Sequence, residues 1–193
     1  MLLLTKAIFA IMIGFLSSTV LGLFLIPALR KLKVGQKISI FVGDSHRKKE
    51  GTPTMGGLIF IVPTILAILF LLITDKVTYT SNIGIVLLVF LGYASIGFLD
   101  DFLSIRRGNN EGLTAYQKLF MQVLIAIGFF YIYMKNGGQT SFVVGMLGID
   151  IELGWLYGLL ILFVLVGASN AVNLTDGLDG LAGGLSAIAF IAF

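Results

Sequence analysis

The sequence of 193 residues contains no cysteine, one histidine and only three prolines. Without cysteine there is no disulfide and no thiol nucleophile, and the redox compartment stays undefined. Charged residues are also scarce, at 12% of the chain, which is about half the share found in soluble domains. The low charge therefore argues against a soluble protein.

Hydrophobic residues dominate instead: they make up 58% of the sequence, and the mean hydropathy is +1.03. A helix needs about 20 apolar residues to cross the ~30 Å hydrocarbon core of a bilayer. We predict an all-α polytopic membrane protein with five full transmembrane helices and the start of a sixth. The apolar runs lie at 7–27, 57–74, 83–103, 118–134 and 155–173, and the last begins near 181.

The sixth apolar run is short, because only about 13 residues follow Gly180. Either the chain ends inside a membrane segment or this run does not cross the bilayer. We expect the first, so that residues 1–193 form a single integral membrane domain that is one part of a longer protein.

Lysine and arginine are distributed unevenly among the connections between these runs. The 28–54 and 104–118 connections are rich in them, whereas 75–82 and 135–154 hold one lysine each. The positive-inside rule then places the two basic connections in the cytoplasm and the N-terminus outside. By parity the segment 173–180 is cytoplasmic too.

Three polar clusters therefore share the cytoplasmic interface, where they can form one site: His46–Gly57, Asp100-Asp101 and Asn170–Asp179. The outer connection is different, because its residues alternate around two glycines. It predicts a small external β-hairpin near 141–153 without chemistry. Other glycines are expected only to let helices pack closely; they are Gly14, Gly22, Gly92, Gly97, Gly128 and Gly158.

Asp100 and Asp101 end the third apolar run, in the sequence Gly97-Phe-Leu-Asp-Asp. Acids at a helix C-terminus oppose the helix dipole, so a plain surface role explains them poorly. Adjacent helical residues also point about 100° apart. We therefore predict that one carboxylate faces a site while the other accepts hydrogen bonds or pairs with a lysine.

The segment Asn170–Gly184 carries Asn173, Asp176 and Asp179 at spacings of three between apolar runs. An acid at the centre of a membrane helix costs roughly 2.5–3.5 kcal/mol, which favours a functional role. In a helix these side chains drift around one face; if glycines break the helix, the freed amides suit an anion. Either geometry suits a phosphate with Mg²⁺, because the donors are oxygens. A broken helix of a transporter is the alternative.

The cluster His46–Gly57 leads into the second apolar run, and Thr54 is expected to cap the helix that follows. Lys48 and Lys49 alone would indicate attraction to anionic lipid. The neighbouring Thr52-Pro-Thr and the paired glycines instead favour an anion-binding loop.

Lys118 opens the fourth run at the same face, where it either snorkels to the interface or joins the site. Together the clusters offer acids, lysines and glycine-freed amides. Phosphoryl transfer relies on charge neutralisation, in-line positioning and a metal more than on covalent chemistry. The sequence therefore favours a membrane enzyme that moves a phosphate-linked group onto a lipid.

The three motifs closely resemble those of the phospho-N-acetylmuramoyl-pentapeptide transferase family. They read His46-x-Lys-Lys-x-Gly-Thr-Pro-Thr-Met-Gly-Gly57, Gly97-Phe-Leu-Asp-Asp101 and Asn170-Ala-Val-Asn-Leu-Thr-Asp-Gly-Leu-Asp-Gly180. The last two are shared across the polyprenyl-phosphate N-acetylhexosamine-1-phosphate transferase superfamily, whereas Thr-Pro-Thr-Met-Gly-Gly and Asn-Ala-Val-Asn-Leu-Thr are more specific. The resemblance implies a ten-span fold with a cytoplasmic cleft, in the bacterial cytoplasmic membrane.

The implied reaction moves phospho-MurNAc-pentapeptide from UDP-MurNAc-pentapeptide to undecaprenyl phosphate with Mg²⁺, giving lipid I and UMP for peptidoglycan synthesis. The implied partners are these two substrates, the bilayer and a second copy in a homodimer, with no nucleic acid. The family's further spans, its histidine-rich loop and another metal-ligating aspartate are not in this sequence. We therefore expect residues 1–193 alone to be inactive.

Carried over by motif, three acids are the catalytic residues and contribute to the metal site. Asp100 is the base that deprotonates the lipid phosphate, Asp101 lines the same site, and Asp176 lies near the diphosphate. The main metal ligand is expected outside this sequence. The implied substrate-binding residues are Lys48, Lys49, Thr52, Thr54, Lys118, Asn173, Gly177, Leu178 and Asp179.

Two alternatives stay open. A sister enzyme that transfers GlcNAc-1-phosphate or another sugar phosphate from its UDP sugar to the same lipid would share both aspartate motifs but not, typically, the Thr-Pro-Thr-Met-Gly-Gly run. A non-enzymatic transporter with a broken helix is more remote.

Overall fold

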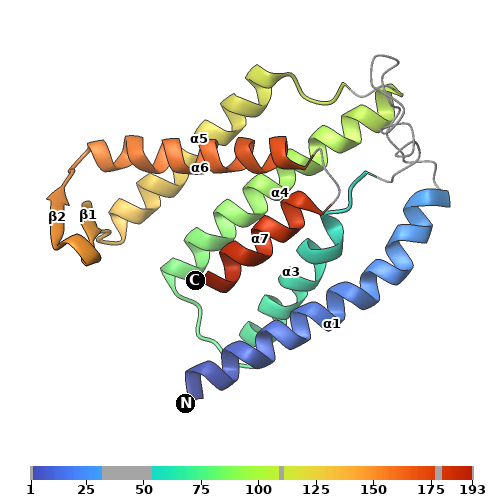
Figure 1. Ribbon diagram of the computed structural model, residues 1–193, viewed down its shortest axis with the longest axis horizontal. Coiled ribbons are helices and arrows are strands. Elements are labelled where there is room, and N and C mark those ends of the chain that lie inside the picture. The colour runs from blue at the N-terminus through green and yellow to red at the C-terminus, as the bar shows by residue number, and fades with distance from the viewer. Residues whose placement is uncertain (1, 32–53, 109–110, 177–179, 193) are drawn as a thin grey trace. The chain divides into compact units, whose positions relative to one another are not determined.

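The computed structural model describes residues 2–31, 54–108, 111–176 and 180–192. Its helices are α1 (Leu2–Lys31), α3 (Leu58–Ile73), α4 (Ser81–Arg107), α5 (Ala115–Lys135), α6 (Leu156–Thr175) and α7 (Leu181–Ala192) (Figure 1). Two short strands, β1 (Ser141–Val144) and β2 (Ile149–Glu152), lie between α5 and α6. The prediction of a helical protein with one small hairpin is confirmed.

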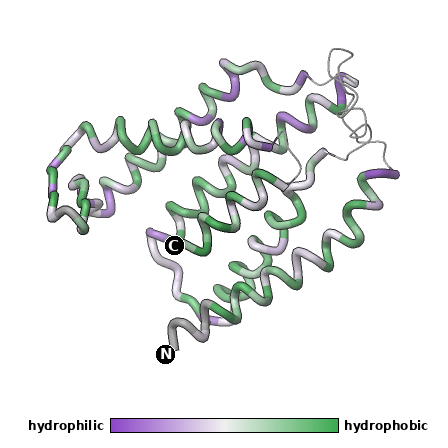
Figure 2. The backbone as a smooth tube through the Cα atoms, viewed as in Figure 1, coloured by the Kyte–Doolittle hydropathy of each residue, from purple (hydrophilic) through white to green (hydrophobic). Residues whose placement is uncertain are grey.

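Among the described residues, four helices are long and apolar enough to cross a membrane, namely Ile8–Lys31 within α1, and α4, α5 and α6. Figure 2 shows that hydrophobic residues prevail along them. The prediction of a polytopic membrane protein is thereby confirmed. The predicted span 57–74 forms α3, whose 16 residues rise about 24 Å, less than the ~30 Å hydrocarbon core.

Many large side chains on these helices face outward. Phe15, Phe24 and Phe163 are 70–74% exposed, and each would cost about 1.5–3 kcal/mol to keep in water. In a bilayer the same side chains meet acyl chains. The exposed apolar faces of these helices are therefore suited to contact with lipid.

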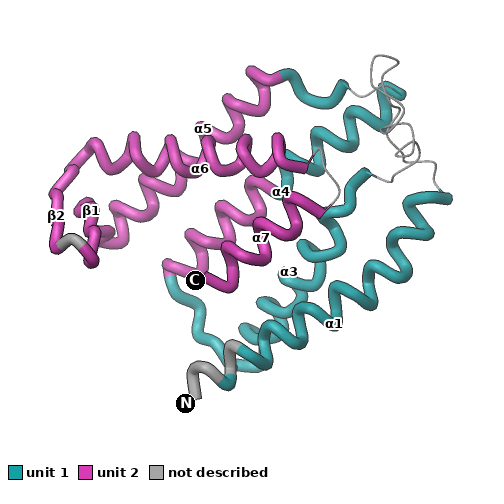
Figure 3. Tube along the Cα trace, in the orientation of Figure 1, with its two compact units in different colours: residues 1–80, 94–114 teal, residues 81–93, 115–193 magenta. Residues whose placement is uncertain are grey.

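The chain divides into two compact units (Figure 3). Residues 1–80 and 94–114 form the first unit, with α1, α3 and the C-terminal part of α4. Residues 81–93 and 115–193 form the second unit, with the start of α4, the hairpin, and α5 to α7.

In the first unit α1 packs against α3. The turn after α3 places Asp75 at φ +53°. The amides of Asp75 and Lys76 donate to the carbonyl oxygens of Leu72 and Leu71 at 3.3 and 3.0 Å. This is a Schellman ending, which uses the carbonyls that the helix leaves unpaired.

In the second unit α5 packs against α6, and the hairpin connects them. α5 ends in a Schellman motif with Gly137 at φ +76°. The amides of Gly137 and Gly138 donate to Met134 and Tyr133 at 3.1 and 3.0 Å. Glycine suits this ending because an L side chain rarely adopts a positive φ.

The packing role predicted for six glycines holds for four of them. A Cβ at Gly92 would lie 2.8 Å from Ile125, and one at Gly158 would lie 2.8 Å from Phe130. Gly22 and Gly128 have ordinary contacts with Ile59 and Leu88. A Cβ at Gly14 or Gly97 would meet no described atom within 4 Å, and the packing role of these two glycines stays a prediction.

The hairpin pairs its strands antiparallel, with Phe142 opposite Ile151 and Val144 opposite Ile149. Because side chains alternate along a strand, these four lie on one face. Ser141, Val143, Asp150 and Glu152 lie on the other.

Candidate active site

Asp100 and Asp101 lie near the end of α4, where their carboxylates hold two different loops. The backbone N–H of Leu113 donates to Asp100 Oδ1 at 2.7 Å, and that of Met55 donates to Asp101 Oδ2 at 2.7 Å. The adjacent acids have separate partners, as their divergent directions predict. Both accept backbone hydrogen bonds, however, whereas the sequence assigned that task to only one.

Met55 adopts φ +65°, which a non-glycine residue rarely does. Such a conformation costs about 1–3 kcal/mol, and a hydrogen bond to a charged acceptor contributes about 1.5–3 kcal/mol. The bond from Met55 to Asp101 therefore offsets the strain of the segment that enters α3. It also joins residues 46 positions apart, so two of the three predicted motifs meet here.

Gly112 lies so close to Asp100 that no side chain fits there. An added Cβ would overlap Asp100 Oδ1 and lie 2.5 Å from the Asp100 carbonyl oxygen. Arg107 Nη1 donates to the carbonyl oxygens of Gly112 and Glu111 at 2.7 and 3.2 Å. Sequence reasoning missed Gly112 and Arg107, which together hold this connection against the end of α4.

Thr54 was expected to cap the helix that follows, and this expectation is wrong. α3 begins at Leu58 with Gly57 as its N-cap and without a side-chain cap. The Thr54 hydroxyl oxygen is buried and has no hydrogen-bond partner among the described residues. Buried polar atoms nearly always have a partner, and the ligand-binding role of Thr54 stays a prediction.

In the second unit α6 ends at Thr175, and Asp176 is its C-cap. Asn173 is therefore helical, and both Asn173 and Asp176 are exposed. Gly180 has φ +79°, and its carbonyl accepts the first helical bond of α7, from Gly184 at 2.8 Å. The helix is thus interrupted inside the segment Asn170–Gly184, between the end of α6 and the start of α7, as the glycine-broken alternative predicts. The first backbone amides of α7 have no hydrogen-bond partners within the helix.

One turn deeper, three polar side chains link α5 to α6. Asn170 Nδ2 donates to Gln122 Oε1 at 2.8 Å and to the Val166 carbonyl at 2.8 Å. Gln122 Nε2 donates to Ser169 Oγ at 3.3 Å. Sequence reasoning missed Gln122 and Ser169, although a glutamine inside an apolar run was a signal.

Lys118 is half-buried near the start of α5. Several other predicted site residues fall outside the described part of the chain; they are Lys48, Lys49, Thr52, Gly177, Leu178 and Asp179. Within the described part, no group of three or more His, Cys, Asp or Glu side chains could hold a metal. The metal site at Asp100, Asp101 and Asp176 stays a prediction, as does the meeting of Asp176 with the α4 acids.

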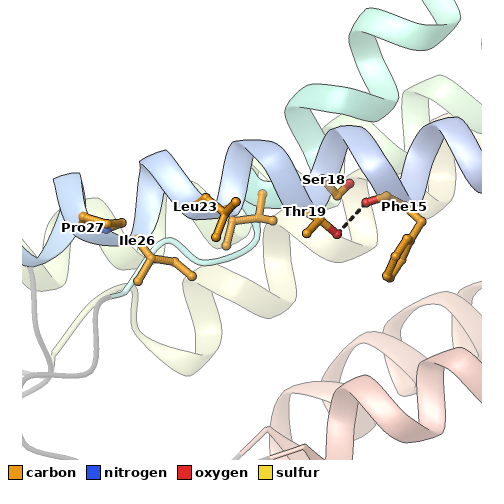
Figure 4. Close-up of a pocket in the computed structure, with 8 residues that line it drawn as sticks. Phe15, Ser18, Thr19, Leu23, Ile26 and Pro27 are labelled. Carbon is orange, nitrogen blue, oxygen red and sulfur yellow. Dashed lines mark hydrogen bonds between the residues drawn. The ribbon is translucent and has the colours of Figure 1, made fainter.

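An apolar groove runs along α1 in the first unit (Figure 4). Phe15, Leu23 and Ile26 line it with Ile59 of α3. The Thr19 hydroxyl in the groove donates to the Phe15 carbonyl at 2.8 Å. Phe15, Leu23, Ile26 and Ile59 give the groove an apolar surface, as expected for a helix pair that faces lipid.

The sequence model of glycosyl transferase family 4 matches residues 83–193, which include both acidic motifs. The chain belongs to this family. A second, shorter match covers residues 49–61 and is described as signature 1 of phospho-N-acetylmuramoyl-pentapeptide transferase. It contains Met55, the residue bound to Asp101.

Curated relatives carry the same description. The chain is 48% identical over 187 residues to the phospho-N-acetylmuramoyl-pentapeptide transferase of Bacillus velezensis, which covers 96% of the chain and 57% of that protein. The Bacillus subtilis protein of that name is 46% identical with the same coverage, and the Oceanobacillus iheyensis one is 43% identical over 98% of the chain and 58% of its own length. The chain thus spans somewhat more than half of these family members.

Proposed function

We propose that this chain is part of an enzyme that transfers phospho-MurNAc-pentapeptide from UDP-MurNAc-pentapeptide to undecaprenyl phosphate. The products are lipid I and UMP. The enzyme sits in the bacterial cytoplasmic membrane with its site facing the cytoplasm and serves peptidoglycan synthesis.

One observation carries the proposal: the 49–61 signature of phospho-N-acetylmuramoyl-pentapeptide transferases is tied by the Met55–Asp101 hydrogen bond to the acidic pair of the wider family. The signature favours the muramoyl-pentapeptide branch over the sister that transfers GlcNAc-1-phosphate. The buried Thr54 hydroxyl, within the same signature, supports a ligand at this point.

In the reaction an oxygen of the lipid phosphate forms a bond to the sugar-linked phosphorus of the UDP sugar. The bond from that phosphorus to the bridging oxygen breaks, and UMP leaves. Asp100 takes the proton of the lipid phosphate, with its carboxylate held in orientation by the Leu113 amide. Asn173, Asp176 and Lys118 bind the nucleotide end, and the first amides of α7 supply donors for phosphate oxygens.

Mg²⁺ fits this chemistry, because it is commonly held by one or two carboxylates together with substrate phosphates. Asp176, exposed at the end of α6, is the described carboxylate best placed to contribute one ligand. The ion would neutralise charge on the diphosphate. Asp100 and Asp101 already hold backbone amides, so the fit at these acids is weaker.

The test uses a hybrid enzyme, in which residues 1–193 replace the matching segment of the Bacillus subtilis relative. Labelled UMP is incubated with UDP-MurNAc-pentapeptide, undecaprenyl phosphate and Mg²⁺ in membranes that hold the hybrid. Label should enter the UDP sugar, because transfer is reversible through lipid I. A transporter would give no exchange.

The purified 193-residue chain, assayed alone, should also give no exchange of labelled UMP into the UDP sugar. Lipid I formation by the chain alone would overturn the expectation that its site is completed by residues outside this sequence.

A further inference from the structure

The deepest polar feature of the second unit is the contact between Gln122 on α5 and Asn170 on α6. Gln122 is 4% exposed, and it is the buried polar side chain of the described part of the chain. It lies inside a helix long and apolar enough to cross a membrane. Burial of an amide in such surroundings is unfavourable unless its donors and acceptor are used.

The amides meet this requirement by bonding across the two helices. Across the helices Asn170 Nδ2 donates to Gln122 Oε1, and Gln122 Nε2 donates to Ser169 Oγ. Asn170 Nδ2 also donates to the Val166 carbonyl within α6. Such bonds fix the rotation and the register of one helix against the other, because the amides have one good alignment. Apolar side chains between two helices in lipid would allow several alignments of the helices.

The residues that the proposed function uses lie just beyond this contact on both helices. Lys118 is four residues before Gln122, hence one turn away on the same face of α5. Asn173 and Asp176 follow Asn170 by three and six residues, about 5 and 9 Å along α6. Because α5 runs toward the hairpin and α6 runs away from it, these three residues lie at the same end of the pair.

We propose that Gln122 is a positioning residue: its amide pair with Asn170 sets the α6 end that carries Asn173 and Asp176 against the α5 start that carries Lys118. The pair thereby fixes the geometry in which the nucleotide sugar is bound. This inference rests on the proposed function. The residue acts through α6 and does not itself touch substrate.

The test exploits the absence of cysteine, since spin labels can be attached only where cysteines are introduced. One label pair, at the exposed positions Leu119 and Leu174, reports the polar end of α5 and α6. A second pair, at the exposed Tyr131 and Leu159, reports the hairpin end. Distance distributions are measured for both pairs in the 193-residue chain in lipid nanodiscs.

Gln122→Leu should broaden or shift the distance at the polar end and leave the hairpin end unchanged. The swap Gln122→Asn with Asn170→Gln rebuilds an amide pair and should restore the original distance. Gln117→Leu, on the exposed surface of α5, is the matched control and should change neither. No change at either end, or equal broadening at both, would overturn the positioning role.

The functional half of the proposal is measured in the hybrid enzyme. Gln122→Leu should raise KM for the nucleotide sugar about tenfold, because small misplacements of binding groups have effects of this size or more, and the swap should restore it. A changed distance with an unchanged KM would overturn the link to substrate. If the unsubstituted hybrid shows no transfer, the proposed function fails, while the distances still decide whether the amide pair positions α6.

Discussion

The end of α4 and the end of α6 both present acids at the edge of an apolar helix, but they treat those acids differently. Asp100 and Asp101 each accept a hydrogen bond at 2.7 Å from a backbone amide outside α4, one in the connection that follows it and one 46 residues earlier. Asp176 is an exposed C-cap, and the polar contacts nearby belong to carboxamides one turn or more deeper. In the first region carboxylates make the structural hydrogen bonds, whereas in the second carboxamides make them and the acid is exposed.

Acids in similar sequence settings, each at the end of an apolar helix, can therefore differ: some are hydrogen-bonded within the fold and others are exposed. Substitution at the α4 end should disturb both the loops and the chemistry, because the same carboxylates serve both. Substitution of Asp176 should disturb binding while the fold stays intact.

The largest expected effect is that of Asp100→Asn in the hybrid enzyme. Asparagine keeps an oxygen for the Leu113 amide but cannot take a proton from the lipid phosphate. Turnover should fall by about 10²–10⁴-fold, the usual contribution of a general base, while the UDP substrate still binds. Turnover is measured as UMP release and binding by calorimetry; loss of binding would instead assign Asp100 a structural or metal role.

The next effect concerns Gly112, on which the Asp100 loop depends. Gly112→Ala places a Cβ against Asp100 Oδ1, and overpacking of this kind costs about 1–3 kcal/mol. The free energy of unfolding in mixed micelles should fall by that amount, and transfer should fall with it.

Gly97→Ala is the matched control, three residues from Asp100 in the same helix. Its Cβ would meet nothing, and alanine in a helix is favoured over glycine by about 0.5–1 kcal/mol. Equal destabilisation by both variants would show that Gly112 is not pressed against Asp100.

Asp176→Asn tests the other side of the comparison. We expect KM for the nucleotide sugar to rise about tenfold, because one charge-assisted contact is worth roughly 1.5–3 kcal/mol. Thermal stability should hold within about 0.5 kcal/mol, as for exposed sites. Asp150→Asn, on the exposed strand β2, serves as the control; a large stability loss at Asp176 alone would mean that its carboxylate also builds the fold.

The smallest effect is expected at the hairpin, which lies outside both of the acidic regions. Thr140 Oγ1 donates to the Glu152 carboxylate on an exposed surface. Thr140→Val should change the free energy of unfolding by no more than about 1 kcal/mol and leave transfer unchanged. A marked loss of transfer in the hybrid enzyme would show that the hairpin contributes to the reaction, contrary to this prediction.

Much of this fold was predictable because apolar runs and loop composition are local signals. Run lengths gave α1, α4, α5 and α6 to within a few residues, and the glycine-punctuated alternation gave the hairpin at 141–152. Thr54 was misjudged as a cap because α3 begins at Leu58, four residues later, and its N-cap is Gly57.

The candidate site was predictable in its residue types and less so in its contacts. The motifs indicated Asp100, Asp101 and Asp176, but no local pattern specifies that Met55 and Leu113 donate to the α4 acids. Gln122 and Ser169 were missed because the bonds of Gln122 to Asn170 and Ser169 span 48 and 47 residues and depend on how α5 meets α6. Long-range hydrogen bonds of this kind follow from packing.

The most direct test of the account is the identity of the donor that the hybrid enzyme accepts. Membranes with the hybrid are given undecaprenyl phosphate, Mg²⁺ and either UDP-MurNAc-pentapeptide or UDP-GlcNAc, and the lipid product is identified by mass spectrometry. We predict lipid I with UMP release from the first donor, and no lipid product from the second. A lipid-linked GlcNAc phosphate in place of lipid I would contradict the account and assign the chain to the sister branch.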